Sequence, residues 1–159
     1  MRFITRYFTR AAPMLSEAGV RDARAFAALH AASFARGWSE DEIERLLLDR
    51  QVIAHRAVAD GAVTGLILSR RAADEAEILS VAVSRRERGR GIANRLLDLH
   101  LRRLAALGVR TVFLEVEAEN AAACRLYARA GFREVGRRDG YYQSAGGAAK
   151  ALVLRRDIA

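Results

Sequence analysis

The sequence predicts an α/β (α+β) domain in which a mixed, mostly antiparallel sheet carries helices on both faces. Two observations lead to this prediction. The first half of the chain has two amphipathic helical segments, followed by strand-like segments joined by a hairpin turn. The second half alternates strand, helix, strand and helix and closes with two strands. This combination favours one layered sheet with helices packed on each side.

The chain length predicts a single domain. At 159 residues, about 70% of the unfolded surface can be buried, so a stable core needs no disulfide or metal. We assign residues 14–159 to this domain and residues 1–13 to an N-terminal extension, in which Arg2, Arg6 and Arg10 recur without an acid. The extension has two interpretations, a targeting segment or a loosely attached tail.

Composition limits the expected partners. The net charge is +8, and Lys150 is the single lysine among 27 Lys and Arg residues. This charge indicates an acidic partner or simply a solvated basic surface. Because the arginines lack interleaved aromatic residues, we expect no direct reading of nucleic acid. One cysteine fits a reducing compartment, no apolar run is long enough for a membrane span, and the three histidines lack metal-ligand spacing. We therefore expect a cytoplasmic, metal-free protein, either a monomer or a weak homodimer.

Two helices begin the predicted domain. The first covers residues 22–35, with Asp22 as its cap and Phe26 on its apolar side. The second starts at Ser39, whose hydroxyl can accept a hydrogen bond from the N–H of Glu42 while the Glu42 carboxylate reaches back. This capping box, with further acids in the first turn, predicts a helix start.

A hairpin follows the helices. Residues 51–59 and 62–69 have the character of strands, and Asp60-Gly61 between them is a strong signal for a two-residue turn. Residues 70–76 are polar and are predicted to be a connection.

The centre of the sequence predicts an anion site. Residues 77–83 form a strand and residues 95–107 a helix, with the stretch Arg88–Asn94 between them. Gly89 and Gly91 lack a Cβ atom, so a ligand can approach the backbone closely. At a helix start the first N–H groups have no partner within the helix and the macrodipole is positive, which favours binding of a phosphate group.

The last part of the chain predicts three more strands and one helix. The strand at 111–117 is followed by a helix at 120–130, and the final strands are expected at 132–138 and 149–155. The stretch 139–147 between the final strands is predicted to be a loop.

Taken together, these segments resemble the Gcn5-related N-acetyltransferase (GNAT) family over roughly residues 14–159. The resemblance implies the fold of that family and an acetyltransferase activity. The features that carry it are, in chain order, Ile78–Val83 followed by Arg88–Ala93, then Leu114-Glu115-Val116 followed by Asn120 and Leu126-Tyr127, and finally Ala130-Gly131-Phe132.

Within the family, the chain is most similar to RimI-like peptide N-terminal acetyltransferases, which act on ribosomal proteins. The spacing of Glu115, Asn120 and Tyr127 resembles theirs, as do Trp38 before the second helix and the late Tyr141-Tyr142 pair. The resemblance implies a peptide or protein N-terminus as the acceptor, such as that of a ribosomal protein.

Two departures from the RimI-like pattern fall on the side of the acceptor. Gly37 stands where these proteins usually have proline before the tryptophan. The late segment is Gly140-Tyr141-Tyr142-Gln143, where they usually have Asn-Tyr-Tyr-Pro. The cofactor and the chemistry are therefore better supported than the acceptor.

The resemblance implies acetyl-coenzyme A as the acetyl donor. The glycine loop resembles the family's Arg/Gln-x-x-Gly-x-Gly/Ala loop for the pyrophosphate, and a backbone N–H near Val83 would stabilise the oxyanion. Asn120 would contact the cofactor, although capping of its own helix explains this residue equally well. The implied cofactor-binding residues are Val81, Ala82, Val83, Arg88, Gly89, Arg90, Gly91, Ile92, Ala93, Asn94 and Asn120.

Glu115 is the candidate general base. An N-terminal ammonium has a pKa of about 8 and must lose a proton before its nitrogen can attack, and a carboxylate can take that proton directly or through water. Strand alternation places Glu115 on the opposite face from Leu114 and Val116. Glu117 shares the face of Glu115 and is the rival candidate, although it is expected to be more exposed.

Tyr127 is the candidate general acid for the departing thiolate, because a phenol is neutral at pH 7 and can donate. The alternative is a core tyrosine on an amphipathic helix. Cys124 in the same segment has no nearby histidine to activate it and is expected to be structural.

Aromatic residues on loops are candidates for acceptor binding. Trp38, Tyr141 and Tyr142 could form the walls of a slot for a peptide terminus, or a general interaction surface. Three functions remain open: a peptide α-amine acetyltransferase working by direct transfer in a ternary complex, an acetyltransferase for a small-molecule amine, and a non-catalytic acyl-coenzyme A binding module.

Overall fold

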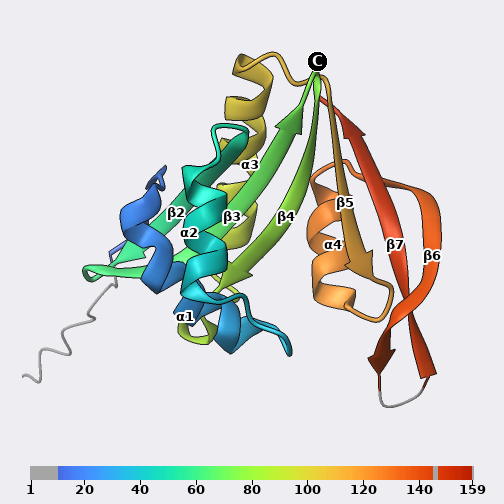
Figure 1. Ribbon diagram of the computed structural model, residues 1–159, viewed down its shortest axis with the longest axis horizontal. Coiled ribbons are helices and arrows are strands. Elements are labelled where there is room, and N and C mark those ends of the chain that lie inside the picture. The colour runs from blue at the N-terminus through green and yellow to red at the C-terminus, as the bar shows by residue number, and fades with distance from the viewer. Residues whose placement is uncertain (1–10, 145–146, 159) are drawn as a thin grey trace, which may run out of the picture.

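The computed structural model describes residues 11–144 and 147–158, and the side chains of residues 140–149 lie outside this description. Within it, seven strands form one sheet in the order β1-β2-β3-β4-β5-β7-β6 (Figure 1). All neighbouring strands run antiparallel except β4 and β5, which are parallel. The strands are β1 (Met14–Glu17), β2 (Val52–Ala59), β3 (Ala62–Ala72), β4 (Glu75–Val83), β5 (Thr111–Glu117), β6 (Arg133–Ser144) and β7 (Gly147–Asp157).

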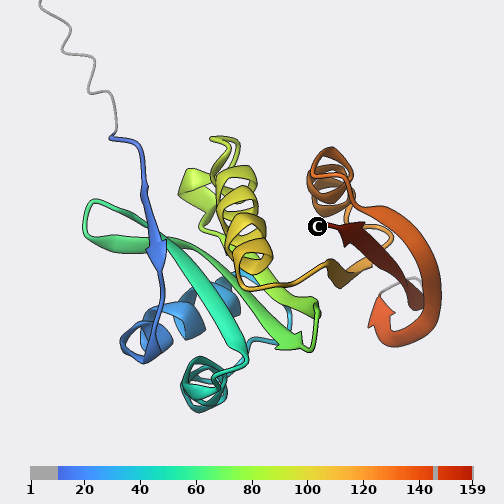
Figure 2. The same cartoon turned by 90° about the horizontal axis from the view of Figure 1, so that it is seen from above.

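Helices cover both faces of the sheet, as predicted (Figure 2). One core lies under α1 and α2 and contains Phe26 and Ile43, and the other lies under α3 and α4 and contains Leu96 and Tyr127. The helices are α1 (Ala23–Ser33), α2 (Glu40–Leu48), α3 (Ile92–Ala106) and α4 (Ala121–Arg129), with short 3-10 turns η1 (Val20–Asp22) and η2 (Arg85–Glu87). Among the described residues, no helix is long and apolar enough to cross a membrane.

The local signals for the second helix and the first hairpin are confirmed. Ser39 caps α2, with the N–H of Glu42 donating to the Ser39 hydroxyl at 3.2 Å and the N–H of Ser39 donating to the Glu42 carboxylate at 2.7 Å. Asp60 and Gly61 form the turn between β2 and β3, with φ of 50° and 76°. Positive φ at both positions is the requirement of a two-residue hairpin turn.

The prediction that Asp22 caps the first helix is wrong. Asp22 stands at the N-cap position of α1, but its side chain makes no capping hydrogen bond there. Its carboxylate instead accepts a hydrogen bond from the N–H of Gly19 at 2.9 Å and pairs with Arg56 at 2.6 Å. The carboxylate is buried, so its guanidinium partner on β2 decides its orientation.

Two predicted connections are parts of strands instead. Residues 70–76 extend the β3–β4 hairpin, where Arg70 lies opposite Glu77 in the register and the chain turns at Ala73, with φ of 54°. Opposite charges on facing positions stabilise such a pair, so the polar composition is compatible with a strand. Residues 139–147, predicted as a loop, lie largely in β6 and β7, whose pairing continues to Ser144 and Gly147 across register shifts.

A buried polar chain crosses the core beneath α3. Ser69 Oγ lies 2.6 Å from His100 Nε2, and His100 Nδ1 lies 2.8 Å from His55 Nδ1. Two neutral imidazole rings can form the hydrogen bond between them, because one Nδ1 can donate while the other accepts. Burial, and then the neighbouring His55, lowers the pKa of His100 to about 3, and burial also lowers the pKa of His55.

Acid is therefore expected to destabilise the protein through these histidines. The folded pKa of His100 lies below the ordinary value of 6.5, so its stabilising contribution is present above pH 6.5 and is lost as the pH falls toward 3. In this pH range, each proton that a histidine takes up on unfolding lowers the free energy of unfolding by about 1.4 kcal/mol for every unit by which the pH falls. The free energy of unfolding of wild type and of His100→Gln can be measured by denaturant titration between about pH 7 and pH 4.5. Its slope against pH should be shallower by about this amount in the variant, and equal slopes would contradict the prediction.

Candidate active site

The glycine loop has the geometry of an anion site. Gly89 and Gly91 adopt left-handed conformations, with φ of +78° and +77°, and Gly91 is the N-cap of α3. A Cβ atom added at either glycine would meet nothing within 4 Å, so the space above the backbone is open. The first N–H groups of α3 lack partners within the helix, as at every helix start, and are available to an anion at this end.

Two arginine side chains brace the same loop. Arg88 Nε donates a hydrogen bond to the carbonyl oxygen of Val83 at 3.1 Å, which ties the loop to the end of β4. Arg90 pairs with Glu87, a carboxylate that is buried under the loop. These contacts hold the two glycines in a fixed position relative to the strand.

Strands β4 and β5 separate beside this loop (Figure 1). Their parallel pairing runs from Glu75↔Thr111 to Ile78↔Leu114 and does not continue to the ends of the two strands. A register shift between β3 and β4 leaves Leu79 as an extra residue, a bulge that the sequence did not predict. Because bulges bend a strand, this one fits the divergence of β4 from β5. The stretch Val81–Val83 therefore lies where β4 has left its neighbour.

Glu115 lies on β5 at the point where the two strands part. As predicted, Leu114 and Val116 are buried, whereas Glu115 and Glu117 face away from that core and are exposed. Arg138 Nε lies 3.1 Å from Glu115 Oε1. The carboxylate is thus partly solvated and held by a guanidinium.

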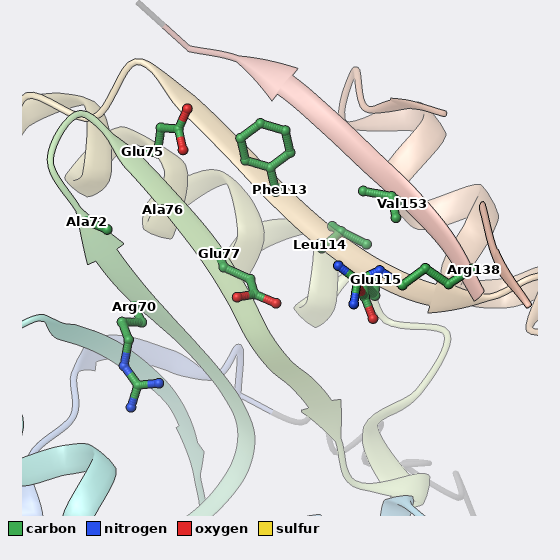
Figure 3. A pocket seen from close by; sticks show the side chains of 10 residues that line it. All are labelled: Arg70, Ala72, Glu75, Ala76, Glu77, Phe113, Leu114, Glu115, Arg138 and Val153. Atoms are coloured by element: carbon green, nitrogen blue, oxygen red, sulfur yellow. Dashed lines mark ion pairs between the residues drawn. The ribbon is translucent and has the colours of Figure 1, made fainter. Parts of the chain in front are cut away.

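A cleft of about 350 Å³ opens beside Glu115 (Figure 3). It combines charged groups of both signs with an apolar floor that includes Phe113. Its lining consists of Arg70, Ala72, Glu75, Ala76, Glu77, Phe113, Leu114, Glu115, Arg138 and Val153. Among these, Arg70, Glu77 and Arg138 are residues that the sequence did not single out, because the pairing of five strands, from β3 to β6, brings them together.

Tyr127 occupies the opposite side of β5. It projects from α4 into the core, is 7% exposed, and meets the Phe132 ring edge-on with 5.7 Å between centroids. Burial, and then the nearby Cys124, raises the pKa of the Tyr127 phenol to about 12, so the phenol remains protonated at neutral pH. No described residue forms a hydrogen bond with its hydroxyl. Within the described part of the chain, the phenol is thus a neutral donor without a hydrogen-bond partner.

Asn120 and Cys124 have local structural contacts. The Asn120 side chain accepts a hydrogen bond from the N–H of Ala123 at 3.1 Å, so it caps α4. Cys124 is half-buried, with Sγ 3.8 Å from the carbonyl oxygen of Glu117. Among the described residues, no group of His, Cys, Asp or Glu side chains could hold a metal ion.

Trp38 lies at a second hollow, of about 510 Å³, between α2 and the β3–β4 hairpin. Its ring stacks on His30 with 4.3 Å between centroids, and the backbone N–H of Trp38 donates a hydrogen bond to His30 Nδ1 at 3.1 Å. A Cβ atom on Gly37 would approach the backbone of Ala31 within 2.8 Å, so this position requires glycine in this chain. Arg70 lines both hollows and connects them.

Comparison with known proteins gives the family. A model of the acetyltransferase (GNAT) family matches residues 23–132. The chain belongs to the GNAT acetyltransferase family. It is therefore an acyltransferase, as the glycine loop and the pattern of Glu115, Asn120 and Tyr127 predicted.

Individual relatives agree with the family. The [ribosomal protein bS18]-alanine N-acetyltransferase of Salmonella typhimurium is 35% identical over 126 residues, which span 76% of this chain and 81% of that protein. The crystal structure of the ribosomal-protein-S18-alanine N-acetyltransferase from Escherichia coli matches with a TM-score of 0.86 at 26% identity, over 92% of this chain and 94% of that one. Arabidopsis thaliana NAA60 in complex with acetyl-CoA has the same fold, with a TM-score of 0.80 at 22% identity and coverage of 92% and 98%. This chain is a GNAT N-acetyltransferase similar to RimI proteins.

In this acetyltransferase, most of the predicted site residues lie around the point where β4 and β5 diverge. The loop from Arg88 to Asn94 follows β4, Glu115 and Tyr127 lie on opposite sides of β5, and Trp38 lies at the neighbouring hollow. Tyr141 and Tyr142 belong to β6, but their side chains lie outside the described residues. Their contribution to an acceptor site remains a prediction.

Proposed function

We propose that this acetyltransferase transfers the acetyl group of acetyl-coenzyme A to the N-terminal α-amine of a peptide or protein. The observation that carries the proposal is the separation of β4 from β5, with the open glycine loop at the end of one strand and the Glu115 carboxylate facing a cleft on the other. The activity of the Salmonella relative, acetylation of an alanine of ribosomal protein bS18, supports this acceptor class. A ribosomal protein in the cytoplasm is the acceptor that we expect.

The glycine loop and the free edge of β4 are the proposed cofactor site. The N–H groups at the start of α3 would hold the pyrophosphate, with Gly89 and Gly91 allowing close approach. Val81, Ala82 and Val83 would align the acyl arm along the strand edge that β5 leaves unpaired. Ile92, Ala93 and Asn94 belong to the first turn of α3, and Arg88 and Arg90 brace the loop. Asn120, at the start of α4, would contact the cofactor from the side of β5.

Direct transfer requires three residues in distinct roles. The neutral amine nitrogen attacks the thioester carbonyl carbon, and the N–C bond forms while the C–S bond breaks. Glu115 takes the proton from the amine, directly or through a water molecule. A backbone N–H near Val83 stabilises the oxyanion, and the Tyr127 hydroxyl gives a proton to the thiolate. No acyl-enzyme is formed, so both substrates are bound together.

Transfer of labelled acetyl groups tests the acceptor class. We expect the enzyme to label peptides that have a free α-amine. The same peptides with a blocked terminus and an unmodified lysine should carry no label, and polyamines or aminoglycosides should carry little. Mass spectrometry locates the acetyl group. Label on the small amines in preference to every peptide would replace this proposal with a small-molecule acetyltransferase.

Gly91→Ala tests the cofactor site. Position 91 has φ of +77°, where a Cβ atom costs about 1–2 kcal/mol, and the methyl group would enter the space proposed for the pyrophosphate. We expect acetyl-coenzyme A to bind at least 10-fold more weakly, measured by calorimetry.

Gly61→Ala is the matched control for this measurement. Gly61 has nearly the same φ, +76°, and the same open surroundings, but it lies in the β2–β3 turn. Both variants should lose similar stability, whereas Gly61→Ala should keep the affinity for the cofactor. Equal affinities in the two variants would exclude the glycine loop from the cofactor site.

A further inference from the structure

The contact between Arg138 and Glu115 connects residues from strands that are not neighbours. Arg138 is on the edge strand β6, Glu115 is on β5, and β7 lies between them. Adjacent strands are about 4.8 Å apart, so the side chain of Arg138 must cross one whole strand to reach Glu115. The cleft view shows the two side chains meeting at one end of the cleft (Figure 3).

A small residue on β7 makes this crossing possible. In the sheet register Ala151 lies opposite Arg138 on one side and Glu117 on the other, and directly opposed residues share a face. Ala151 is buried and contributes only a methyl group, so the guanidinium can extend over it toward Glu115. A larger side chain at position 151 would occupy this path.

The shape of β6 also directs Arg138 toward the cleft. The pairing of β6 with β7 skips Val135, and it skips Gly140 and Tyr141 between Asp139 and Tyr142. Such irregularities bend a strand and increase its twist. Figure 2 shows β6 strongly curved, and Arg138 lies between the two irregularities.

We propose that Arg138 is a positioning residue for Glu115, holding one carboxylate oxygen so that the other faces the acceptor amine. The inference depends on the proposed role of Glu115 as the base. Arg138 Nε contacts Oε1, which leaves Oε2 available for the proton. The terminal torsion of a glutamate is broad, whereas a guanidinium is planar and donates in fixed directions, so the pair restricts the carboxylate.

The effect should appear in catalysis and not in stability. The side chains of Arg138 and Glu115 are 69% and 36% exposed, and exposed ion pairs contribute little to folding. Arg138→Gln should therefore unfold within about 2 °C of wild type. Its kcat should fall about 10- to 100-fold, the scale of a small misplacement of a catalytic group, with KM for the peptide changed less than about twofold. Arg138→Lys should recover part of this loss.

Arg137→Gln is the matched control. Arg137 is the preceding residue, and its guanidinium pairs with Glu134 on its own strand instead of reaching the cleft. The substitution removes the same charge from the same hairpin and should leave kcat unchanged. A similar loss of kcat in both variants would assign the effect to net charge and overturn the proposal.

A double-mutant cycle with Glu115→Gln separates the proposal from its premise. If Arg138 acts through Glu115, then Arg138→Gln should have no further effect on kcat in the Glu115→Gln protein. A full additional loss there, or an increase in KM with kcat unchanged, would show that Arg138 acts on the acceptor itself and would overturn the proposal. Full activity of Glu115→Gln alone would instead refute the role of Glu115, whereas a slow Glu115→Gln beside a full-rate Arg138→Gln would refute only the role of Arg138.

Discussion

Replacing Glu115 with glutamine is expected to lower kcat by about 100- to 10,000-fold, the usual contribution of a general base. Glutamine keeps the size of the side chain but cannot accept the proton of the attacking amine. Because Glu115 is exposed at the cleft and not part of the core, the fold and the affinity for acetyl-coenzyme A should remain unchanged. Single-turnover rates measured with saturating peptide report the chemical step directly.

The pH dependence of the variant gives a second measure of the same role. Without the base, only amine that is already neutral can react, so the residual rate should rise with pH until the amine titrates at about pH 8. Glu117→Gln is the control, since Glu117 shares the face and the strand of Glu115 but does not line the cleft. A large loss in Glu117→Gln with full activity in Glu115→Gln would transfer the role of base to the rival carboxylate.

The features that the sequence predicted correctly depend on neighbouring residues. The Ser39–Glu42 capping box involves one turn of helix, the Asp60-Gly61 turn involves two residues, and the faces of β5 follow from strict alternation. The conformation of the glycine loop belongs to the same class, because the strand, the short turn η2, the two glycines and the helix are consecutive along the chain. In each case the local geometry leaves one arrangement in which the backbone torsions are allowed and the backbone hydrogen bonds are formed.

The features that could not be predicted depend on which distant strands become neighbours. Arg138 reaches Glu115 only because β7 returns between β5 and β6 with Ala151 at the crossing point. His55 and His100 are 45 positions apart, and packing of α3 on β2 brings their rings together. Asp22 has the composition of a cap, yet Arg56 from β2 determines its contacts. A long-range partner outweighs the local preference in that case.

Replacing Tyr127 with phenylalanine is expected to lower the single-turnover rate by about 10- to 100-fold while preserving the fold, on the scale of losing one proton donor. The ring packs against Phe132 in the core, and phenylalanine keeps that contact while removing only the hydroxyl. The departing thiolate would then have to take its proton from water. Because burial raises the pKa of the phenol to about 12, the wild-type donor stays protonated at all pH values usable for assay.

The thiol leaving group provides the decisive comparison for Tyr127. If the phenol protonates the thiolate, a more acidic thiol needs less help in leaving. With an acyl donor that carries such a thiol, the difference in rate between wild type and Tyr127→Phe should therefore be smaller. Cys124→Ala is the control within the same helix, since Cys124 lies one turn before Tyr127 and its thiol contacts the backbone carbonyl oxygens of Glu117 and Ala118. A difference in rate of the same size for both donors would mean that the hydroxyl positions the acyl chain and does not transfer a proton to sulfur. An unchanged rate in Tyr127→Phe would remove the hydroxyl from the reaction, leaving Tyr127 as a core residue whose pKa is raised by burial and by the nearby Cys124.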